Sequence, residues 1–276
     1  MVKDILLNLE HSNSRDVVRD YAISIAERFE AHLVGLAFAG GIPKYMLPDF
    51  PADVLAEILT ESERAAKAAV TRFAAATKRS GINAEHHLIT QCEFGPAQTF
   101  SAFARRFDLS VLMQSGDGDD MNNDVLIETA LFGSGRPVIV VPYIQKNGLD
   151  LDRVICCWDG SRAAARALND SLPFLAKAGA VEVLIVNTDR DKAVEVEFHG
   201  FEVSNHLARH DVNVELTTLS LGGSDVTNVI LSHAADCSAG MVVMGGYGHS
   251  RAREFVLGGV TRGMLSSMTV PMFMSQ

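Results

Sequence analysis

The chain has 276 residues, of which 47% are hydrophobic and 21% are charged. These proportions are typical of a globular protein long enough for about two domains, and they exclude an extensively disordered chain. The formal net charge of −10 and the pI near 5.3 argue against a nucleic-acid partner, because binding a phosphate backbone usually needs a dense basic stripe.

The amino-terminal residues contain no apolar signal core, and no stretch approaches the roughly 20 apolar residues that a membrane-spanning helix needs. We therefore expect a soluble, cytoplasmic protein with no membrane partner. The four cysteines, Cys92, Cys156, Cys157 and Cys237, form no CxxC pair, so buried reduced thiols are expected.

Apolar runs and amphipathic stretches alternate along the chain and predict a regular succession of strands and helices. In the first half the predicted strands are residues 4–9, 32–38, 85–90, 109–114 and 138–141. Helical periodicity predicts a helix over 16–29, and an insertion from residue 40 to about 80 contains an Ala-rich helix after Pro51. In the second half the predicted strands are 153–158, 181–187, 213–219, 240–245 and 270–274, with a helix over 260–268.

The two halves repeat one plan. Residues 4–12 superpose on 153–161, and residues 33–38 on 182–187, both at an offset of 149. Residues 109–113 match 240–244 at an offset of 131, as if the first half held 18 more residues in its middle, and residues 136–141 match 270–275 at an offset of 134. We therefore expect two α/β domains with parallel sheets, over residues 1–146 and 151–276, joined by a polar linker over 143–152.

The most informative segment follows the predicted strand 240–245. Gly245 and Gly248 stand at the end of this strand, and Gly258 and Gly259 precede the helix at 260–268. Glycines let the backbone approach a phosphate closely, and a helix N-terminus offers free N–H groups and a partial positive charge. Ligands of open α/β sheets bind at the carboxyl ends of the strands, so the segment predicts a site for a phosphorylated ligand. A tight turn between strand and helix is the alternative explanation.

With the repeat in view, the second half resembles the universal stress protein family, whose nucleotide-binding members carry GxxG, nine residues, and then Gly followed by Ser or Thr. Gly245 and Gly248 supply the first pair, and nine residues separate Gly248 from Gly258. The resemblance spans both halves and implies a tandem member with two Rossmann-like domains. Each would be an open five-stranded parallel sheet in the order 3-2-1-4-5, flanked by helices. The last strands of the two domains would pair within the chain as a pseudo-dimer, with homodimerisation left open.

The resemblance also implies a stress-response sensor or regulator that binds ATP or ADP, with or without Mg²⁺, in its second domain. Trp158 and Asp159 match the family's segment after the first strand, which puts Asp159 at the ribose or adenine edge, although an Asp here also suits a helix cap. Val186 and Asn187 end the second strand and border the adenine pocket, with core packing as the alternative for Val186. The remaining expected contacts are Met244, Gly245, Gly248, Arg251, Gly258, Gly259, Val260 and Thr261.

Two departures from the family pattern matter. Gly259 stands where nucleotide-binding members have a hydroxyl, so one hydrogen bond to phosphate, worth roughly 1.5–3 kcal/mol, is missing, with Thr261 as a nearby substitute. In the first half, residues 114–117 stand opposite 245–248, Asp124 opposite Gly258, and Glu10 opposite Asp159. Because carboxylates repel phosphate, we expect the first domain to bind no nucleoside triphosphate.

The sequence gives little support to catalysis or to a metal site. Ser12 and Ser161 lie in no GxSxG elbow. His206 and His210, and likewise His233 and Cys237, are four residues apart, but neither pair has an evident third ligand, so ordinary surface side chains are the preferred interpretation. Two other functions stay open: a slow ATP hydrolase with an unidentified water-orienting group, and a nucleotide-free interaction module in which Gly259 marks lost binding.

Overall fold

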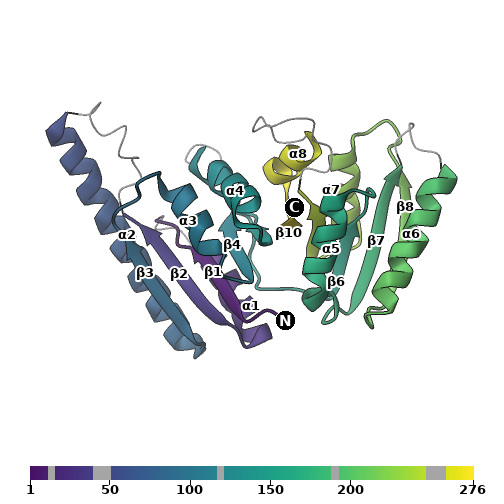
Figure 1. The fold of residues 1–276 in the computed structure, drawn as a ribbon, viewed down its shortest axis with the longest axis horizontal. Helices are drawn as coiled ribbons and strands as arrows, with labels where there is room; N and C mark the ends of the chain where they lie inside the picture. The colour runs from purple at the N-terminus through teal and green to yellow at the C-terminus, as the bar shows by residue number, and fades with distance from the viewer. Residues whose placement is uncertain (12–15, 40–50, 117–120, 188–192, 247–258) are drawn as a thin grey trace. The chain divides into compact units, whose positions relative to one another are not determined.

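The computed structural model describes residues 1–11, 16–39, 51–116, 121–187, 193–246 and 259–276 (Figure 1). The chain divides into two compact units, Met1–Leu149 and Asp150–Gln276, so the division falls within the stretch expected to be the linker. Among the described helices, none combines the length and the apolar character that crossing a membrane requires.

The first unit is built on parallel strands that run in the order β3-β2-β1-β4-β5. Their bounds are β1 (Asp4–Asn8), β2 (His32–Phe38), β3 (Ala84–Ile89), β4 (Leu109–Met113) and β5 (Val138–Val141). Its helices are α1 (Val17–Phe29), α2 (Ala52–Ser80), α3 (Pro96–Ala104) and α4 (Met121–Ser134). Helix α1 packs against α2, and α3 packs against α4, so right-handed crossovers place one pair on each face of the sheet.

The second unit repeats this arrangement, with strands in the order β8-β7-β6-β9-β10. Their bounds are β6 (Arg153–Cys157), β7 (Ala180–Asn187), β8 (Val214–Ser220), β9 (Met241–Gly245) and β10 (Met272–Ser275). Its helices are α5 (Arg162–Leu175), α6 (Ala193–Ala208), α7 (Val226–Asp236) and α8 (Gly259–Ser267). The predicted fold, a Rossmann-like open sheet in the order 3-2-1-4-5, is confirmed.

The inner strands form the core because helices cover both of their faces. Continuous apolar runs such as β5 are buried along their whole length, as parallel strands packed between two helical layers require. The edge strands β3 and β8 consist of exposed and half-buried residues, without a fully buried one. Helix α1 begins where expected, since Asp16 is its N-cap and accepts a hydrogen bond from the Arg19 N–H (3.3 Å).

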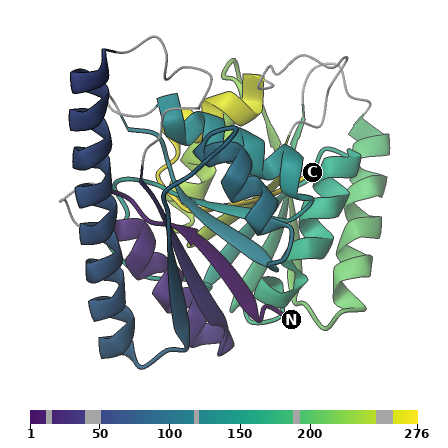
Figure 2. The same ribbon diagram turned by 60° about the vertical axis from the view of Figure 1, so that its left-hand side comes forward.

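Helix α2 is the insertion that distinguishes the first unit. Its second half packs on β2, β3 and α1 through small and aromatic side chains, among them Ala69 and Phe73. Its first half is mostly exposed, with Val54, Ile58 and Leu59 at the surface. Figure 2 shows α2, in dark blue, as one long straight helix.

The strand registers correct one sequence expectation. Ile5 of β1 pairs with Leu109 of β4, and its equivalent Val154 of β6 pairs with Met241 of β9. The offset between β4 and β9 is therefore 132 (241 minus 109), and the predicted value of 131 was wrong. The apolar runs allowed a slip of one residue because strands buried on both faces show no polar alternation that would fix their alignment.

This correction changes which residues are equivalent at the ends of these strands. Met113 now stands opposite Gly245, and counting onward puts Gly116 opposite Gly248. The first half therefore retains one glycine of the pair and lacks the other. It holds 17 additional residues in its middle (149 minus 132), one fewer than predicted.

Candidate functional site

In the second unit, two predicted site residues lie at neighbouring strand ends. The Trp158 N–H donates to the Leu184 carbonyl oxygen (2.9 Å), which extends the β6–β7 ladder one step beyond the pair Cys157 and Leu184. Asn187 is the last residue of β7. By strand alternation, Trp158 and Asn187 lie on the same face of the sheet and Val186 on the other. The carboxyl ends of β6 and β7 thus place an indole and an amide on the same face of the sheet edge.

Both of these side chains bury a polar atom without a protein partner. Trp158 Nε1 and Asn187 Oδ1 have no hydrogen-bond partner within the part of the chain that the structure describes. An indole N–H only donates and an amide oxygen only accepts. An unsatisfied buried polar group costs about 1–3 kcal/mol, so a ligand that offered one acceptor and one donor here would gain from both.

Asp159 forms a turn between β6 and α5. Its Oδ1 accepts a hydrogen bond from the Ser161 N–H (2.9 Å), and Gly160 takes a φ of 74°, which glycine adopts without strain. The helix cap is Ser161, whose hydroxyl accepts from the Ala164 N–H (3.0 Å). The alternative in which Asp159 caps the helix is therefore wrong, and its carboxylate is exposed beside Trp158.

At the end of β9, Gly245 has a packing role of its own. A Cβ built at this position would lie 2.5 Å from the Ala163 carbonyl carbon and 2.9 Å from the Ala163 Cβ. The first turn of α5 thus packs directly on the Gly245 backbone, and only glycine fits. The preceding Met244 is buried in the core, opposite Met274 of β10.

The start of α8 offers open space. Gly259 is its first residue, and no described heavy atom lies within 4 Å of a Cβ built there. Val260 is exposed, whereas Thr261 is buried with Met264 and Leu265 on the inner side of the helix. The first N–H groups of any helix lack acceptors within the helix, so α8 begins with donors available to an anion. Gly248, Arg251 and Gly258 lie outside the described residues.

No protein-family model and no curated protein matches the sequence. Among solved structures, a universal stress protein from Archaeoglobus fulgidus DSM 4304 matches with a TM-score of 0.71 and 18% identity, over 99% of this chain and 96% of that one. The chain has the fold of a tandem universal stress protein. A functionally unknown protein from Pseudomonas aeruginosa PAO1 also matches, with a TM-score of 0.66 and 14% identity, over 99% of this chain and 92% of that one.

Both of these matches extend over the two halves of this chain, as the tandem resemblance predicted. A shorter structure matches only part of the chain. It is a universal stress protein from Archaeoglobus fulgidus in complex with dAMP, with 14% identity and a TM-score of 0.35, over 51% of this chain and 98% of that one.

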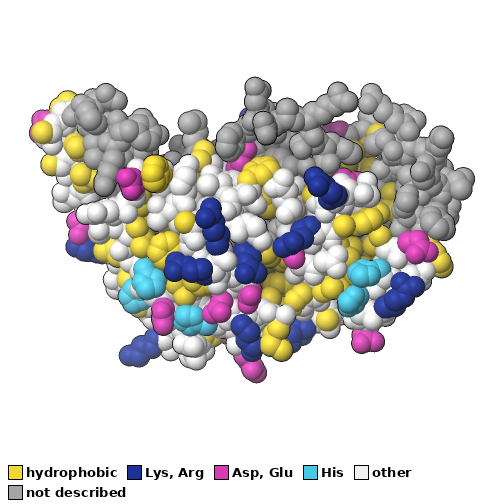
Figure 3. Space-filling view, viewed as in Figure 1, with side chains coloured by type: hydrophobic (Ala, Val, Ile, Leu, Met, Phe, Trp, Pro, Cys, Tyr) yellow, Lys and Arg dark blue, Asp and Glu magenta, His cyan; other side chains and the backbone are white. Residues whose placement is uncertain are grey.

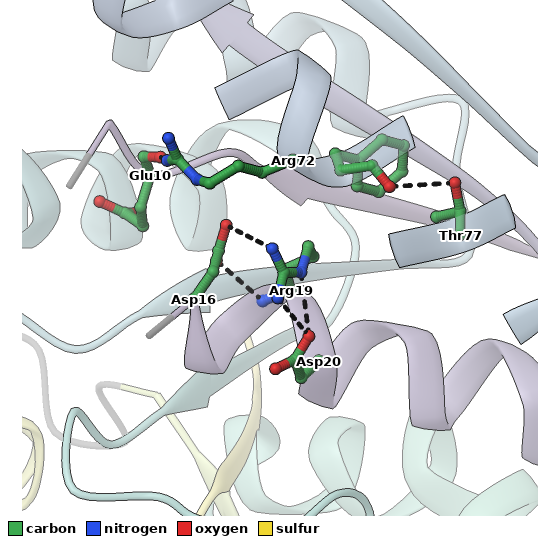
Figure 4. Close-up of polar contacts among 7 residues, drawn as sticks. Glu10, Asp16, Arg19, Asp20, Arg72 and Thr77 are labelled. Carbon is green, nitrogen blue, oxygen red and sulfur yellow. Dashed lines mark hydrogen bonds and ion pairs between the residues drawn. The ribbon is translucent and has the colours of Figure 1, made fainter. Parts of the chain in front are cut away.

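The corresponding edge of the first unit is occupied by the protein's own charged groups (Figure 4). Arg72 reaches over from α2 and donates to the Glu10 carbonyl oxygen (3.0 Å). Ser115 donates its hydroxyl hydrogen to Asp124 Oδ1 (2.7 Å), which fixes a carboxylate in the first turn of α4. Asp16 lies beside Arg19 and near Arg72, and burial raises the pKa of its carboxyl. Both arginine and acidic side chains thus lie at this edge.

The cysteines are all free thiols, as expected, although only Cys92 and Cys156 are fully buried. Burial, followed by the nearby carboxylates of Asp159 and Glu182, raises the pKa of the Cys157 thiol to about 12. Burial also raises the pKa of Cys156. Both thiols of the pair are therefore protonated at neutral pH and are poor nucleophiles.

Histidines gather in two places on the face drawn in Figure 3, one over each unit. The rings of His206 and His210 meet edge to face with centroids 4.8 Å apart, and the described residues bring no third ligand to them. His233 and Cys237 differ, because Glu182 of β7 joins them. Glu182 was not among the predicted site residues, although an acidic residue inside the apolar run of β7 is a usable signal in the sequence.

Proposed function

We propose that the second unit binds an adenine nucleotide and that the protein acts as a nucleotide-dependent regulator of a stress response in the cytoplasm. The observation that carries the proposal is the pair of unsatisfied buried atoms, Trp158 Nε1 and Asn187 Oδ1, at the carboxyl edge of the sheet. An adenine ring offers ring-nitrogen acceptors for the indole N–H and an amino group for the amide oxygen. Such a base would remove both desolvation penalties.

The sugar and the phosphates extend from this base along the same edge. Asp159, exposed directly after Trp158, accepts a hydrogen bond that a ribose hydroxyl donates. The phosphates lie against the segment from Gly245 to the start of α8, where Gly248 and Gly258 let the backbone approach and Arg251 supplies a positive charge. Gly259 contributes only its N–H, so the site prefers ADP to ATP unless Mg²⁺ compensates for the missing hydroxyl, because Thr261 is buried on the inner side of α8.

The first unit serves as a scaffold in this proposal. Glu10 stands where Asp159 does, and Asp124, held by Ser115, stands opposite Gly258. Two carboxylates in these places repel the phosphates that the second unit attracts. One nucleotide per chain is the expected stoichiometry.

The test uses a reporter that the chain already contains, because Trp158 is its only tryptophan. Purified native protein is titrated with ADP and with ATP, with and without Mg²⁺, while Trp158 fluorescence is recorded and isothermal calorimetry measures the stoichiometry. We expect a saturable fluorescence change and one site, with binding reduced at least tenfold in Asn187→Ala. No fluorescence change, no calorimetric heat and no adenine nucleotide released on denaturation would favour a nucleotide-free interaction module.

Measuring phosphate release in the same samples distinguishes a sensor from an enzyme. Bound nucleotide that is retained without release of phosphate supports the regulator. Steady phosphate release that disappears in Asp159→Ala would instead identify a slow hydrolase.

A further inference from the structure

A second polar cluster lies within the second unit, between β7 and α7. Glu182 has a side chain only 3% exposed, and its Oε1 is 2.6 Å from Nε2 of His233. Cys237 follows α7 one turn after His233. The carboxylate oxygen, the imidazole nitrogen and the Cys237 Sγ all lie within 4.8 Å of one another. Three different ligand atoms therefore converge from a strand and a helix.

We propose that Glu182, His233 and Cys237 form a binding site for a zinc-type divalent cation. Carboxylate oxygen, imidazole nitrogen and thiolate sulfur are the donors that Zn²⁺ selects, at about 2.0–2.3 Å each. Tetrahedral bonds of that length put ligand atoms about 3.3–3.8 Å apart. The Oε1–Nε2 distance of 2.6 Å is shorter than this range, and all three ligand atoms lie within 4.8 Å of one another, so side-chain rotations that separate Glu182 from His233 would admit the ion.

Arg153 orients the carboxylate in this site. Its Nη1 is 3.3 Å from Glu182 Oε2, which leaves Oε1 directed at His233. Groups that bind to a metal ligand without touching the metal hold that ligand in the orientation that the metal needs. The same guanidinium repels a dication, but Glu215, 3.8 Å from Arg153 Nη1, offsets part of its charge. A purely structural ion-pair cluster is the competing explanation for these contacts.

Coordination exchanges protons for the metal. Burial, and after it the Glu182 carboxylate, raises the pKa of the Cys237 thiol, so the metal-free protein carries a protonated thiol here. Binding forms the metal–sulfur bond and releases the thiol proton to the buffer. His233 binds through Nε2, so the proton that Nε2 donates to Glu182 in the metal-free protein must leave this nitrogen, and the imidazole coordinates as the neutral tautomer protonated at Nδ1. Three protein ligands leave a fourth position for water.

The experiment titrates the full-length protein, stripped of metal, with Co²⁺ as a spectroscopic probe and with Zn²⁺ in a calorimeter. We expect one equivalent of Co²⁺ to produce the near-ultraviolet charge-transfer absorption of a thiolate ligand. Cys237→Ser should abolish this band and weaken Zn²⁺ binding more than about tenfold, since the loss of an outer partner alone costs about 10–100-fold. Glu182→Gln, which keeps the side-chain shape, should retain the band with weaker affinity.

The matched control is the double variant His206→Asn, His210→Asn, which removes the other pair spaced four residues apart. It should bind both metals as the wild type does. Circular dichroism establishes that each variant is folded. A wild-type protein without the cobalt band, a band that persists in Cys237→Ser, or a band lost in the control would each overturn the proposal, because the three side chains would then not be the ligands.

Discussion

The start of α8 allows a charge test that leaves the packing untouched. A side chain at Gly259 meets no described atom within 4 Å of its Cβ, so both Gly259→Asp and Gly259→Ser fit without strain. The aspartate variant places a carboxylate where the phosphates are proposed to lie, much as Asp124 does in the first unit. The serine variant has nearly the same size, carries no charge and supplies the hydroxyl that the family pattern has at this position.

The magnitudes follow from Coulomb's law and from hydrogen-bond energies. Two unit charges about 4 Å apart interact by about 1 kcal/mol in water and about 4 kcal/mol at an effective dielectric constant of 20. Gly259→Asp should therefore weaken nucleotide binding by about fivefold to several hundredfold. A carboxylate at the N-terminus of a helix stabilises the folded protein by about 0.3–1 kcal/mol through the helix dipole. The Gly259→Asp variant should therefore be as stable as the wild type or slightly more stable. Gly259→Ser should bind ATP about tenfold more tightly or better.

Calorimetric titrations with ADP and ATP measure the affinities, and urea denaturation measures the free energy of unfolding. A loss of binding without a loss of stability assigns the effect to the site. Wild-type affinity for ATP in Gly259→Asp would refute the proposed position of the phosphates. Equal weakening of binding in Gly259→Ser and Gly259→Asp would also refute it, because charge would then not be the cause.

Three further changes test the structure around the two edges. Gly245→Ala should lower the free energy of unfolding by about 1–3 kcal/mol in urea denaturation, because the new methyl group overlaps the Ala163 backbone; an unchanged midpoint would contradict this packing. Ser161→Ala should cost about 1 kcal/mol through the lost cap of α5, and full stability would assign the cap elsewhere. Burial, and after it the Arg72 charge, lowers the pKa of His11, so the native state resists protonation and stability should fall as the pH drops below about 6.5. His11→Gln should flatten that fall, and identical pH profiles would contradict it.

Local patterns predicted the elements of this protein well. The apolar run of β5 and the helical period of α1, with Asp16 before it, give bounds that the structure reproduces to within a residue. The repeat at an offset of 149 predicted that β6 copies β1. Each of these features depends on residues close together in the sequence, and tertiary packing supports the same choice.

Features that depend on contacts between residues far apart in the sequence could not be predicted from the sequence. The partner of Glu182 is 51 residues away, so no local pattern joins it to His233. The glycines predicted a phosphate loop, but the contact of Gly245 with the first turn of α5 arises only when β9 packs beside that helix. The one-residue error between β4 and β9 has the same origin, since only the pairing of strands fixes their register.

Helix α2 is continuous, but its two halves are anchored very differently. Residues from Ala66 onward are held by the sheet, whereas Val54, Ile58 and Leu59 face solvent at 37–42% exposure. A helix segment without packing gains little beyond its own hydrogen bonds, and such segments open at free energies far below that of global unfolding. Amide hydrogens in the first turns of α2 should therefore exchange with solvent long before those near Phe73, so one helix would show two exchange regimes.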